Sequence, residues 1–162
     1  MSERLTTPAR PLPQPDADLG YLFRLAHQRL RALLDSELED LGLSAQDYGI
    51  LSLFDTRSEL SASELARISQ VTRQTMHTSV LSLEAAGLVE RAARNQRVVL
   101  VRLTNRGRNC LEAATRRVRV VEDAALAGLS REDEQTVRAW LATVAAMTTS
   151  PKKAQARQKD KS

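Results

Sequence analysis

The segment 60–107 constrains the fold of this chain more than any other, because helix starts and stops follow one another there in a fixed order. Ser61 is followed three residues later by Glu64, which is the spacing of a capping box at a helix start. Thr72 is the expected cap of a second helix, and Gly87 is its expected stop. The segment therefore predicts two short helices separated by a tight turn.

A hairpin is predicted directly after this helix pair. Residues 88–92 and 98–103 are short runs rich in Leu and Val, separated by a polar link, which is typical of two antiparallel strands. Two helices followed by such a hairpin give the order of a winged helix-turn-helix, in which one helix enters the DNA major groove. We therefore expect a DNA-binding lobe over about residues 44–103.

Long helices are predicted on both sides of this lobe. Apolar residues recur at helical spacing over 19–41 and again within 104–148. The expected helix caps here are Ser44, Thr104 and Ser130, and the expected stop of the first helix is Gly42. Only 3% of the residues are aromatic, which favours an aliphatic core of packed helices. The expected fold is mainly α, a winged helix-turn-helix with a small β-hairpin wing and long N- and C-terminal dimerisation helices.

Both ends of the chain differ in composition from this folded region. Residues 1–17 hold all but one of the five prolines and show no apolar periodicity, as in a flexible arm. Residues 150–162 are charged and of low complexity, which predicts a disordered basic tail. The region between them, 18–149, is expected to form a single domain.

The positive charge of the chain is concentrated in two places. Residues 91–108 contain six arginines and no acidic residue, and residues 151–162 contain five Lys or Arg against one Asp. The net charge is only +4, so the rest of the chain is acidic. Basic charge gathered on a hairpin and a tail is typical of a protein that meets a polyanion.

An apolar stripe with heptad spacing marks the helix after the hairpin. Its members are Leu111, Ala114, Val118, Val121 and Ala125. Such a stripe fits a seam between two subunits, and it equally fits packing against the first helix of the same chain. The periodicity leaves both interpretations open.

Over residues 19–148 the chain resembles the multiple-antibiotic-resistance regulator (MarR) family of winged-helix repressors. Three motifs in this order carry the resemblance: Leu65-Ala66, Leu83-Glu-Ala-Ala-Gly-Leu-Val-Glu-Arg91 and Val101-Arg-Leu-Thr-Asn-Arg-Gly107. The resemblance implies a homodimer with interlocking terminal helices, and an effector pocket between the dimer region and each DNA-binding lobe. Two lobes one helical turn apart would bind double-stranded DNA with a palindromic operator.

The chain departs from the family pattern at three points of this lobe. Thr78 stands where the family usually has an arginine, and Asn95-Gln96-Arg97 keeps only the last residue of the usual Asp-x-Arg wing motif. The link between the strands is also about two residues shorter than usual. The resemblance therefore implies the fold more firmly than the operator sequence.

The exposed face of the second helix of the lobe is expected to contact DNA. Met76, Val80 and Leu83 share one side of this helix, which leaves the other side to solvent. The candidate DNA-binding residues are Ser63, Thr72, Arg73, Gln74, Thr75, His77, Thr78, Arg94 and Arg97.

Different members of this set are expected at different parts of the DNA. Gln74, His77 and Thr78 are expected at base edges, and Arg73 at a base or a phosphate. Ser63 and Thr72 lie at helix N-termini and are expected at phosphates. By the resemblance Arg97 enters the minor groove, with Arg94 as the nearest substitute for the missing wing residues.

A ligand that releases the DNA would need a pocket of its own. The candidate pocket residues are Arg24, His27, Arg31 and Tyr48, which suit a phenolic or carboxylate compound. Cys110 leaves a second possibility, an oxidant-sensing regulator, because two arginines lie near it in sequence. Further alternatives are a ligand-independent DNA-binding protein and a helical protein-interaction module.

Other functional classes find little support in the sequence. Two histidines, one cysteine and no glycine-rich phosphate loop leave no catalytic cluster, no metal site and no cofactor site, so we expect no enzyme. The chain has no long apolar run and no basic-then-apolar start, which predicts a cytoplasmic protein with no membrane partner.

Overall fold

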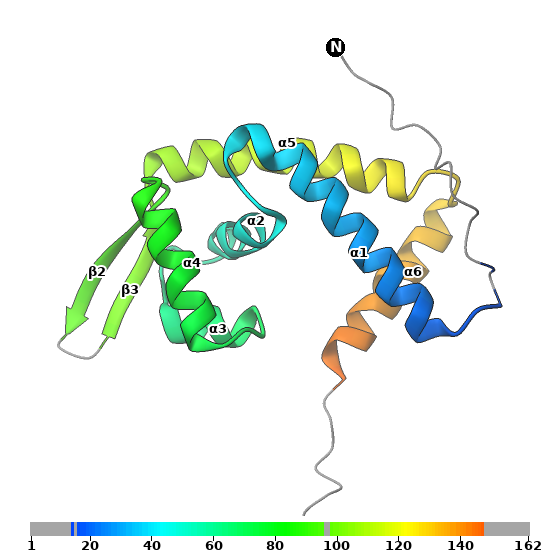
Figure 1. Ribbon diagram of the computed structural model, residues 1–162, viewed down its shortest axis with the longest axis horizontal. Helices are drawn as coiled ribbons and strands as arrows, with labels where there is room; N and C mark the ends of the chain where they lie inside the picture. The colour runs from blue at the N-terminus through cyan, green and yellow to red at the C-terminus, as the bar shows by residue number, and fades with distance from the viewer. Residues whose placement is uncertain (1–13, 15, 96–97, 148–162) are drawn as a thin grey trace, which may run out of the picture. The chain divides into compact units, whose positions relative to one another are not determined.

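The computed structural model describes residues 14, 16–95 and 98–147 of the 162-residue chain (Figure 1). The chain divides into two compact units, one that reaches Ala125 and one that begins at Leu126. The elements of the first unit are α1 (Leu19–Leu38), the 3₁₀ turn η1 (Glu39–Leu41), α2 (Ala45–Ser52), the 3₁₀ turn η2 (Leu53–Asp55), β1 (Leu60–Ser61), α3 (Ala62–Ile68), α4 (Arg73–Ala85), β2 (Val89–Asn95), β3 (Val98–Leu103) and α5 (Asn105–Ala125). The second unit contains α6 (Arg131–Ala146).

The helix starts lie where the sequence predicts them. Ser44 opens α2 and Ser61 opens α3 through complete capping boxes, in which the side chain of Asp47 or Glu64 accepts from the cap's own N–H. Thr72 caps α4 by accepting from the N–H of Thr75. Each of these bonds spans three residues, which explains why the sequence alone identifies them.

Three of the helix stops share one geometry. At the end of α4 the N–H of Gly87 donates to Glu84 and the N–H of Leu88 to Leu83, and Gly87 has a φ of +70°. This pair of bonds is a Schellman motif, which needs a left-handed residue at its centre. The same motif ends η1 at Gly42 and ends α3 at Gln70, which takes a φ of +53° although it carries a side chain.

A small antiparallel sheet carries the predicted hairpin. The strand order is β1-β3-β2, with Val89 opposite Leu103 and Arg91 opposite Val101. The first strand of the hairpin runs to Asn95 rather than ending near residue 92, with a bulge close to its end. The two-residue strand β1 was not predicted, because a run that short has no periodicity to read.

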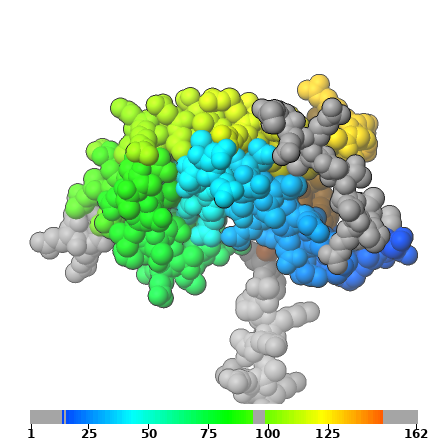
Figure 2. All heavy atoms as spheres, turned by 45° about the horizontal axis from the view of Figure 1, so that its top comes forward, coloured from blue at the N-terminus to red at the C-terminus, as the bar shows by residue number. Residues whose placement is uncertain are grey.

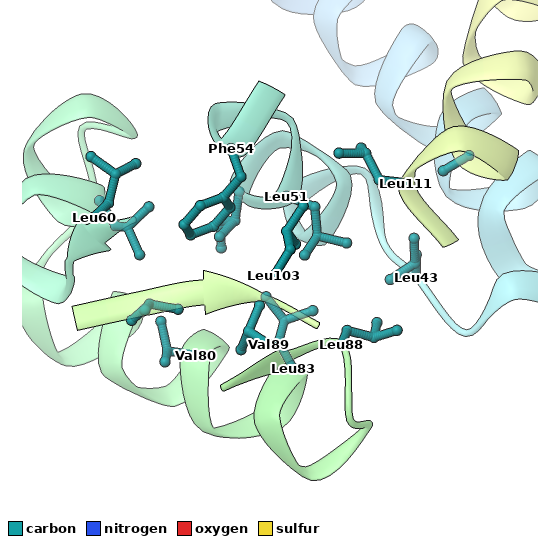
Figure 3. Packing of buried hydrophobic residues seen from close by; sticks show 14 of the residues in the cluster. Leu43, Leu51, Phe54, Leu60, Val80, Leu83, Leu88, Val89, Leu103 and Leu111 are labelled. Atoms are coloured by element: carbon teal, nitrogen blue, oxygen red, sulfur yellow. The ribbon is translucent and has the colours of Figure 1, made fainter. Parts of the chain in front are cut away.

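The core of the first unit lies around this sheet (Figure 3). Leu51 of α2 and Phe54 of η2 approach the strands from one side, and Val80 and Leu83 of α4 lie on the other side. None of the polar or charged residues in the described part of the chain is buried, so the core is purely apolar. Burial of aliphatic side chains therefore holds the helix pair and the hairpin together.

The heptad stripe of α5 is buried within its own chain. Leu111, Ala114, Val118 and Val121 are at most 4% exposed, and α5 packs along α1, as the adjoining yellow-green and blue surfaces in Figure 2 show. The interpretation of this stripe as a seam between subunits is therefore wrong, and packing against the first helix is correct. Ala125, the last member of the stripe, is exposed.

Helix α6 forms the second unit and differs from the others in its burial. Ser130 caps it by accepting from the N–H of Asp133, as the sequence predicts. None of its residues is buried, and Val137, Trp140 and Leu141 are each at least 36% exposed. In the described part of the chain no helix has both the length and the apolar character that crossing a membrane requires.

Candidate nucleic-acid interface and ligand cavity

Helix α4 presents a polar face that is free of the core. Met76, Val80 and Leu83 are at most 3% exposed and fix the helix against the sheet and α3. The opposite side carries five residues predicted to contact DNA, all of them exposed: Arg73, Gln74, Thr75, His77 and Thr78. Ser63 and Thr72, at the starts of α3 and α4, are exposed as well. The predicted division of the helix into a buried and an exposed side is confirmed.

Local hydrogen bonds occupy the threonine hydroxyls of this face. The hydroxyls of Thr72 and Thr75 lie 2.8 Å apart and bond to each other, while Thr78 donates its hydroxyl to the carbonyl of Gln74 at 3.1 Å. The Thr78 side chain therefore offers its methyl group rather than a donor, and a methyl group suits contact with thymine. Within the described part of the chain, the side chains of Arg73, Gln74 and His77 make no hydrogen bond.

The β2–β3 hairpin projects beyond α4 (Figure 1), and an ion pair ties its base to that helix. The guanidinium of Arg91 on β2 meets the carboxylate of Glu84 on α4 through Nη2 at 2.7 Å and Nε at 2.8 Å. A second pair joins the two strands, with Arg102 Nε 2.8 Å from Glu90 Oε1. Among the hairpin-region arginines whose side chains the structure describes, Arg91 and Arg102 are thus engaged in the fold.

The remaining wing candidates are Arg94 and Arg97. Arg97 lies outside the described residues. Arg94 belongs to β2, but its side chain also lies outside what the structure describes. Their predicted contacts with the minor groove stay predictions.

A cavity of about 480 Å³ lies between α1 and the helices of the DNA-binding lobe. Its walls come from α1, α2, α4 and the end of α3. The lining residues are His27, Leu30, Arg31, Leu34, Ala45, Gln46, Gly49, Ile50, Leu53, Ile68, Ser69, Val71 and Met76. A mostly apolar cavity of this size with a few polar groups suits a small organic molecule.

Two of the four predicted pocket residues line this cavity and two do not. His27 and Arg31 are on its wall. Tyr48 instead packs against the hydrophobic core, and Arg24 bonds Gln28 at 3.2 Å with its guanidinium over the Tyr21 ring. The helical spacing on α1 correctly placed His27 and Arg31 on one face of the helix. Arg24 lies two turns before Arg31, beyond the end of the cavity.

Arg31 has a neighbour that links the cavity to the start of α2. Its Nε lies 3.8 Å from Asp35 Oδ2, and Asp35 Oδ1 accepts from the N–H of Ala45 at 2.7 Å. Arg31 is about half exposed, so this pair contributes little to stability and leaves the guanidinium available to another anion. A carboxylate in the cavity would compete with Asp35 for it.

A contact that the sequence analysis missed joins the cavity to α4. Gln46 lines the cavity, and its Nε2 donates to Ser79 Oγ at 3.1 Å. The two residues are 33 positions apart and both are half-buried. No periodicity or motif connects them, so the sequence gives no signal for this pair.

Cys110 lies half-buried at the edge of the core, early in α5. Burial raises the pKa of the Cys110 thiol, and the Arg106 guanidinium offsets part of that rise. A raised pKa favours the thiol over the reactive thiolate at neutral pH. The geometry thus gives no support to the oxidant-sensing alternative.

Comparison with known proteins agrees with the fold. The sequence model described as MarR family matches residues 41–97. The HTH-type transcriptional repressor Rv2887 of Mycobacterium tuberculosis is 34% identical over 128 residues, which cover 78% of this chain and 92% of that protein.

Solved structures give the same result. A MarR-family transcriptional regulator from Rhodococcus sp. RHA1 superimposes with a TM-score of 0.77 at 22% identity, covering 85% of this chain and 99% of that one. The structure of Rv2887 in complex with DNA has a TM-score of 0.66 at 33% identity, covering 80% of this chain and 98% of that one. Rv2887 has also been solved in complex with salicylic acid, with a TM-score of 0.63.

Proposed function

Because this chain belongs to the MarR family of winged helix-turn-helix transcription regulators, which are DNA-binding proteins and not enzymes, we propose that it is a ligand-responsive repressor. In this proposal a homodimer binds a palindromic operator, and a small aromatic acid or phenol releases it. The observation that carries the proposal is the exposed polar face of α4, held beside a basic hairpin on an apolar core. The curated relative at 34% identity is a repressor, which supports the same direction of regulation.

Base reading falls to the unbonded polar side chains of α4. Gln74 pairs with adenine through its amide, and Arg73 and His77 reach guanine or a phosphate. Thr78 offers its methyl group to thymine, because its hydroxyl is bonded to the Gln74 carbonyl. Ser63, at the start of α3, donates to a phosphate. The solved complex of Rv2887 with DNA supports DNA binding by this chain.

The hairpin supplies the second DNA contact. Arg97 enters the minor groove, where a narrow groove deepens the negative potential, and Arg94 lies on the strand that leads to it. Glu84 and Arg91 fix the base of the hairpin to α4, so the two contacts keep a constant separation. Such an arrangement lets one lobe bridge adjacent grooves of the same site.

The apolar surface that α1 and α6 expose supports dimerisation. Leu19, Leu30 and Leu33 of α1 are each at least 38% exposed, and α6 buries none of its residues although it carries Val137 and Leu141 on its surface. Helices with an apolar stripe that the chain itself does not bury gain stability from a second copy. We therefore place the interface between subunits on α1 and α6 and not on the stripe of α5.

The cavity beside α1 is the proposed effector site. A carboxylate or phenolate pairs with Arg31 in place of Asp35, and the aromatic ring lies against the apolar wall. His27 provides a second polar contact on the same wall. The salicylic acid complex of Rv2887 supports this class of ligand.

The test begins with a duplex selected from a random pool by the wild-type protein, and measures its binding by fluorescence anisotropy. Arg97→Ala is expected to weaken binding at least tenfold at physiological salt, about 1.4 kcal/mol or more. Arg102→Ala is the matched control, because it removes the same charge from a residue that pairs with Glu90. Equal losses in both variants would contradict a specific role for Arg97.

Two further measurements complete the test. Sedimentation of the protein alone is expected to give a dimer, and a monomer at micromolar concentration would contradict the proposed assembly. Salicylate is expected to lower the affinity for the selected duplex, and Arg31→Ala to abolish that effect. No change in affinity up to millimolar salicylate would overturn the proposed ligand class.

A further inference from the structure

Gln46 occupies two environments at once. Its side chain is part of the cavity wall, and its amide bonds Ser79 on the DNA-binding helix α4 at 3.1 Å. In the described part of the chain this is the one side-chain hydrogen bond between α2 and α4. A residue placed in this way is in contact both with whatever fills the cavity and with the helix that meets DNA.

Ser79 is suited to set the rotation of α4. It lies one residue before Val80, on the flank between the buried side of the helix and the exposed side that carries Thr78. Apolar contacts of Met76 and Val80 fix the distance of α4 from the core but have little directional preference. A hydrogen bond at the flank adds direction, because it requires donor and acceptor to be aligned.

We infer that Gln46 is a positioning residue for DNA recognition, and that an anionic ligand in the cavity acts on α4 by taking the Gln46 amide away from Ser79. The second half of this inference rests on the proposed function. An amide that bonds a carboxylate makes a stronger hydrogen bond than one that bonds a neutral hydroxyl, so the exchange favours the ligand. Met76, which is on α4, lines the same cavity, so the same occupant also contacts the helix that meets DNA.

This exchange satisfies the thermodynamic requirement for coupling. A ligand shifts an equilibrium only by the difference in its affinity for the two states. Here the ligand binds better when Gln46 is turned toward the cavity, and DNA binds better when Gln46 is turned toward Ser79. Because the Gln46 amide turns toward one partner at a time, the two occupancies oppose each other.

The positioning role is tested by a double-mutant cycle on binding to the selected duplex. Gln46→Leu and Ser79→Ala each remove the bond, and each is expected to weaken DNA binding about fivefold. The double variant is expected to lose no more than either single variant, because the shared bond is lost only once. Losses that multiply, or no loss in Ser79→Ala, would overturn the positioning role.

Ser52→Ala is the matched control for Ser79→Ala. It makes the same chemical change on α2, where the hydroxyl bonds the carbonyl of Gly49 within its own helix. The control is expected to bind the duplex as the wild type does. Thermal unfolding of all variants separates a change in α4 from a general loss of stability, since the inferred effect lowers DNA affinity while the melting temperature stays within a few degrees.

The ligand half is tested with salicylate as the probe. Ser79→Ala leaves the cavity wall intact and removes the competitor for the Gln46 amide. Calorimetry is therefore expected to give a higher salicylate affinity than in the wild type, while the salicylate effect on DNA affinity falls at least threefold. An undiminished effect would overturn the coupling and leave the proposed function standing. If salicylate fails to bind the wild-type protein, the proposed ligand class and the ligand half of this inference fall together, while the mutant cycle still decides the positioning role.

Discussion

The Cα of Gly107 lies against the carbonyl oxygen of Leu88, so closely that a Cβ at this position would overlap the oxygen and crowd Leu103. The same carbonyl accepts from the N–H of Thr104 at 3.1 Å, and the Thr104 hydroxyl accepts from the N–H of Gly107 at 2.9 Å. The start of α5 therefore sits directly on the base of the hairpin. Only a residue without a side chain permits this approach.

Gly107→Ala is expected to destabilise the protein by about 3 kcal/mol, because the backbone must move to relieve the overlap. Urea unfolding followed by circular dichroism measures the change. Gly49→Ala is the control, since a Cβ at Gly49 meets no atom within 4 Å and alanine favours the interior of α2. A loss in Gly107→Ala no larger than in this control would show that the contact is loose.

Glu84→Gln is expected to weaken DNA binding about threefold while changing stability by less than about 1 kcal/mol, because the pair with Arg91 is partly exposed. The loss arises because the hairpin is no longer held at a fixed angle to α4. Fluorescence anisotropy and thermal unfolding measure the two quantities.

Glu90→Gln controls for charge in that experiment. It removes the same negative charge, but its partner Arg102 lies within the hairpin and not across from α4. An effect of net charge alone would strengthen DNA binding in both variants equally. Equal behaviour of the two variants would therefore refute the proposed role of the Glu84 pair.

The capping box of α3 has a measurable acid dependence. Bonds from the Ser61 N–H and hydroxyl hold the pKa of the Glu64 carboxyl below its ordinary value, with Arg57 and Arg67 adding smaller contributions. A carboxyl with a lowered pKa in the folded state stabilises that state above its unfolded pKa, and the contribution is lost as the pH falls through the folded pKa. We expect a carbon-detected NMR titration of Glu64 to have its midpoint below 4.5.

Ser61→Ala provides the comparison for this titration. It removes the hydroxyl that bonds Glu64 at 2.7 Å, so the midpoint is expected to move back toward the ordinary value. An unchanged midpoint would mean that the backbone N–H of residue 61 and the surrounding arginines, rather than the Ser61 hydroxyl, lower the pKa of the Glu64 carboxyl.

Cys110 is expected to react slowly with thiol reagents. Because burial raises its pKa, the thiolate fraction at pH 7.5 is small, and the reaction with Ellman's reagent is expected to be about fivefold or more slower than that of free cysteine. Arg106→Ala is expected to slow it further, since Arg106 lowers the same pKa. Reaction faster than free cysteine would restore the oxidant-sensing alternative.

Local interactions account for most of what the sequence predicts correctly. The caps at Ser44, Ser61, Thr72 and Ser130 bond groups three residues away, and the stops at Gly42 and Gly87 depend on the backbone freedom of one glycine. The buried side of α4 follows from a spacing visible within eight residues. Such features are fixed before any element meets another.

Contacts between distant segments account for what the sequence missed. The bond from Gln46 to Ser79, the two-residue strand at Leu60 and the overlap of Gly107 with Leu88 all depend on the final packing of elements. The stripe of α5 shows the same limit, because its spacing is identical whether it faces α1 or a second subunit. Periodicity identifies the apolar side of a helix but not its neighbour.

The purely apolar interior has a consequence for how related sequences diverge. In the part of the chain that the structure describes, the buried positions require a side chain of a given volume and no polar partner. Replacing one aliphatic residue there by another of similar size is therefore expected to cost little stability. Directional bonds lie at the periphery, at residues such as Thr104, Glu84 and Gln46. Orientation of the DNA-binding elements therefore depends on a few partly exposed polar residues, and substitutions there are expected to alter it more than aliphatic exchanges in the interior.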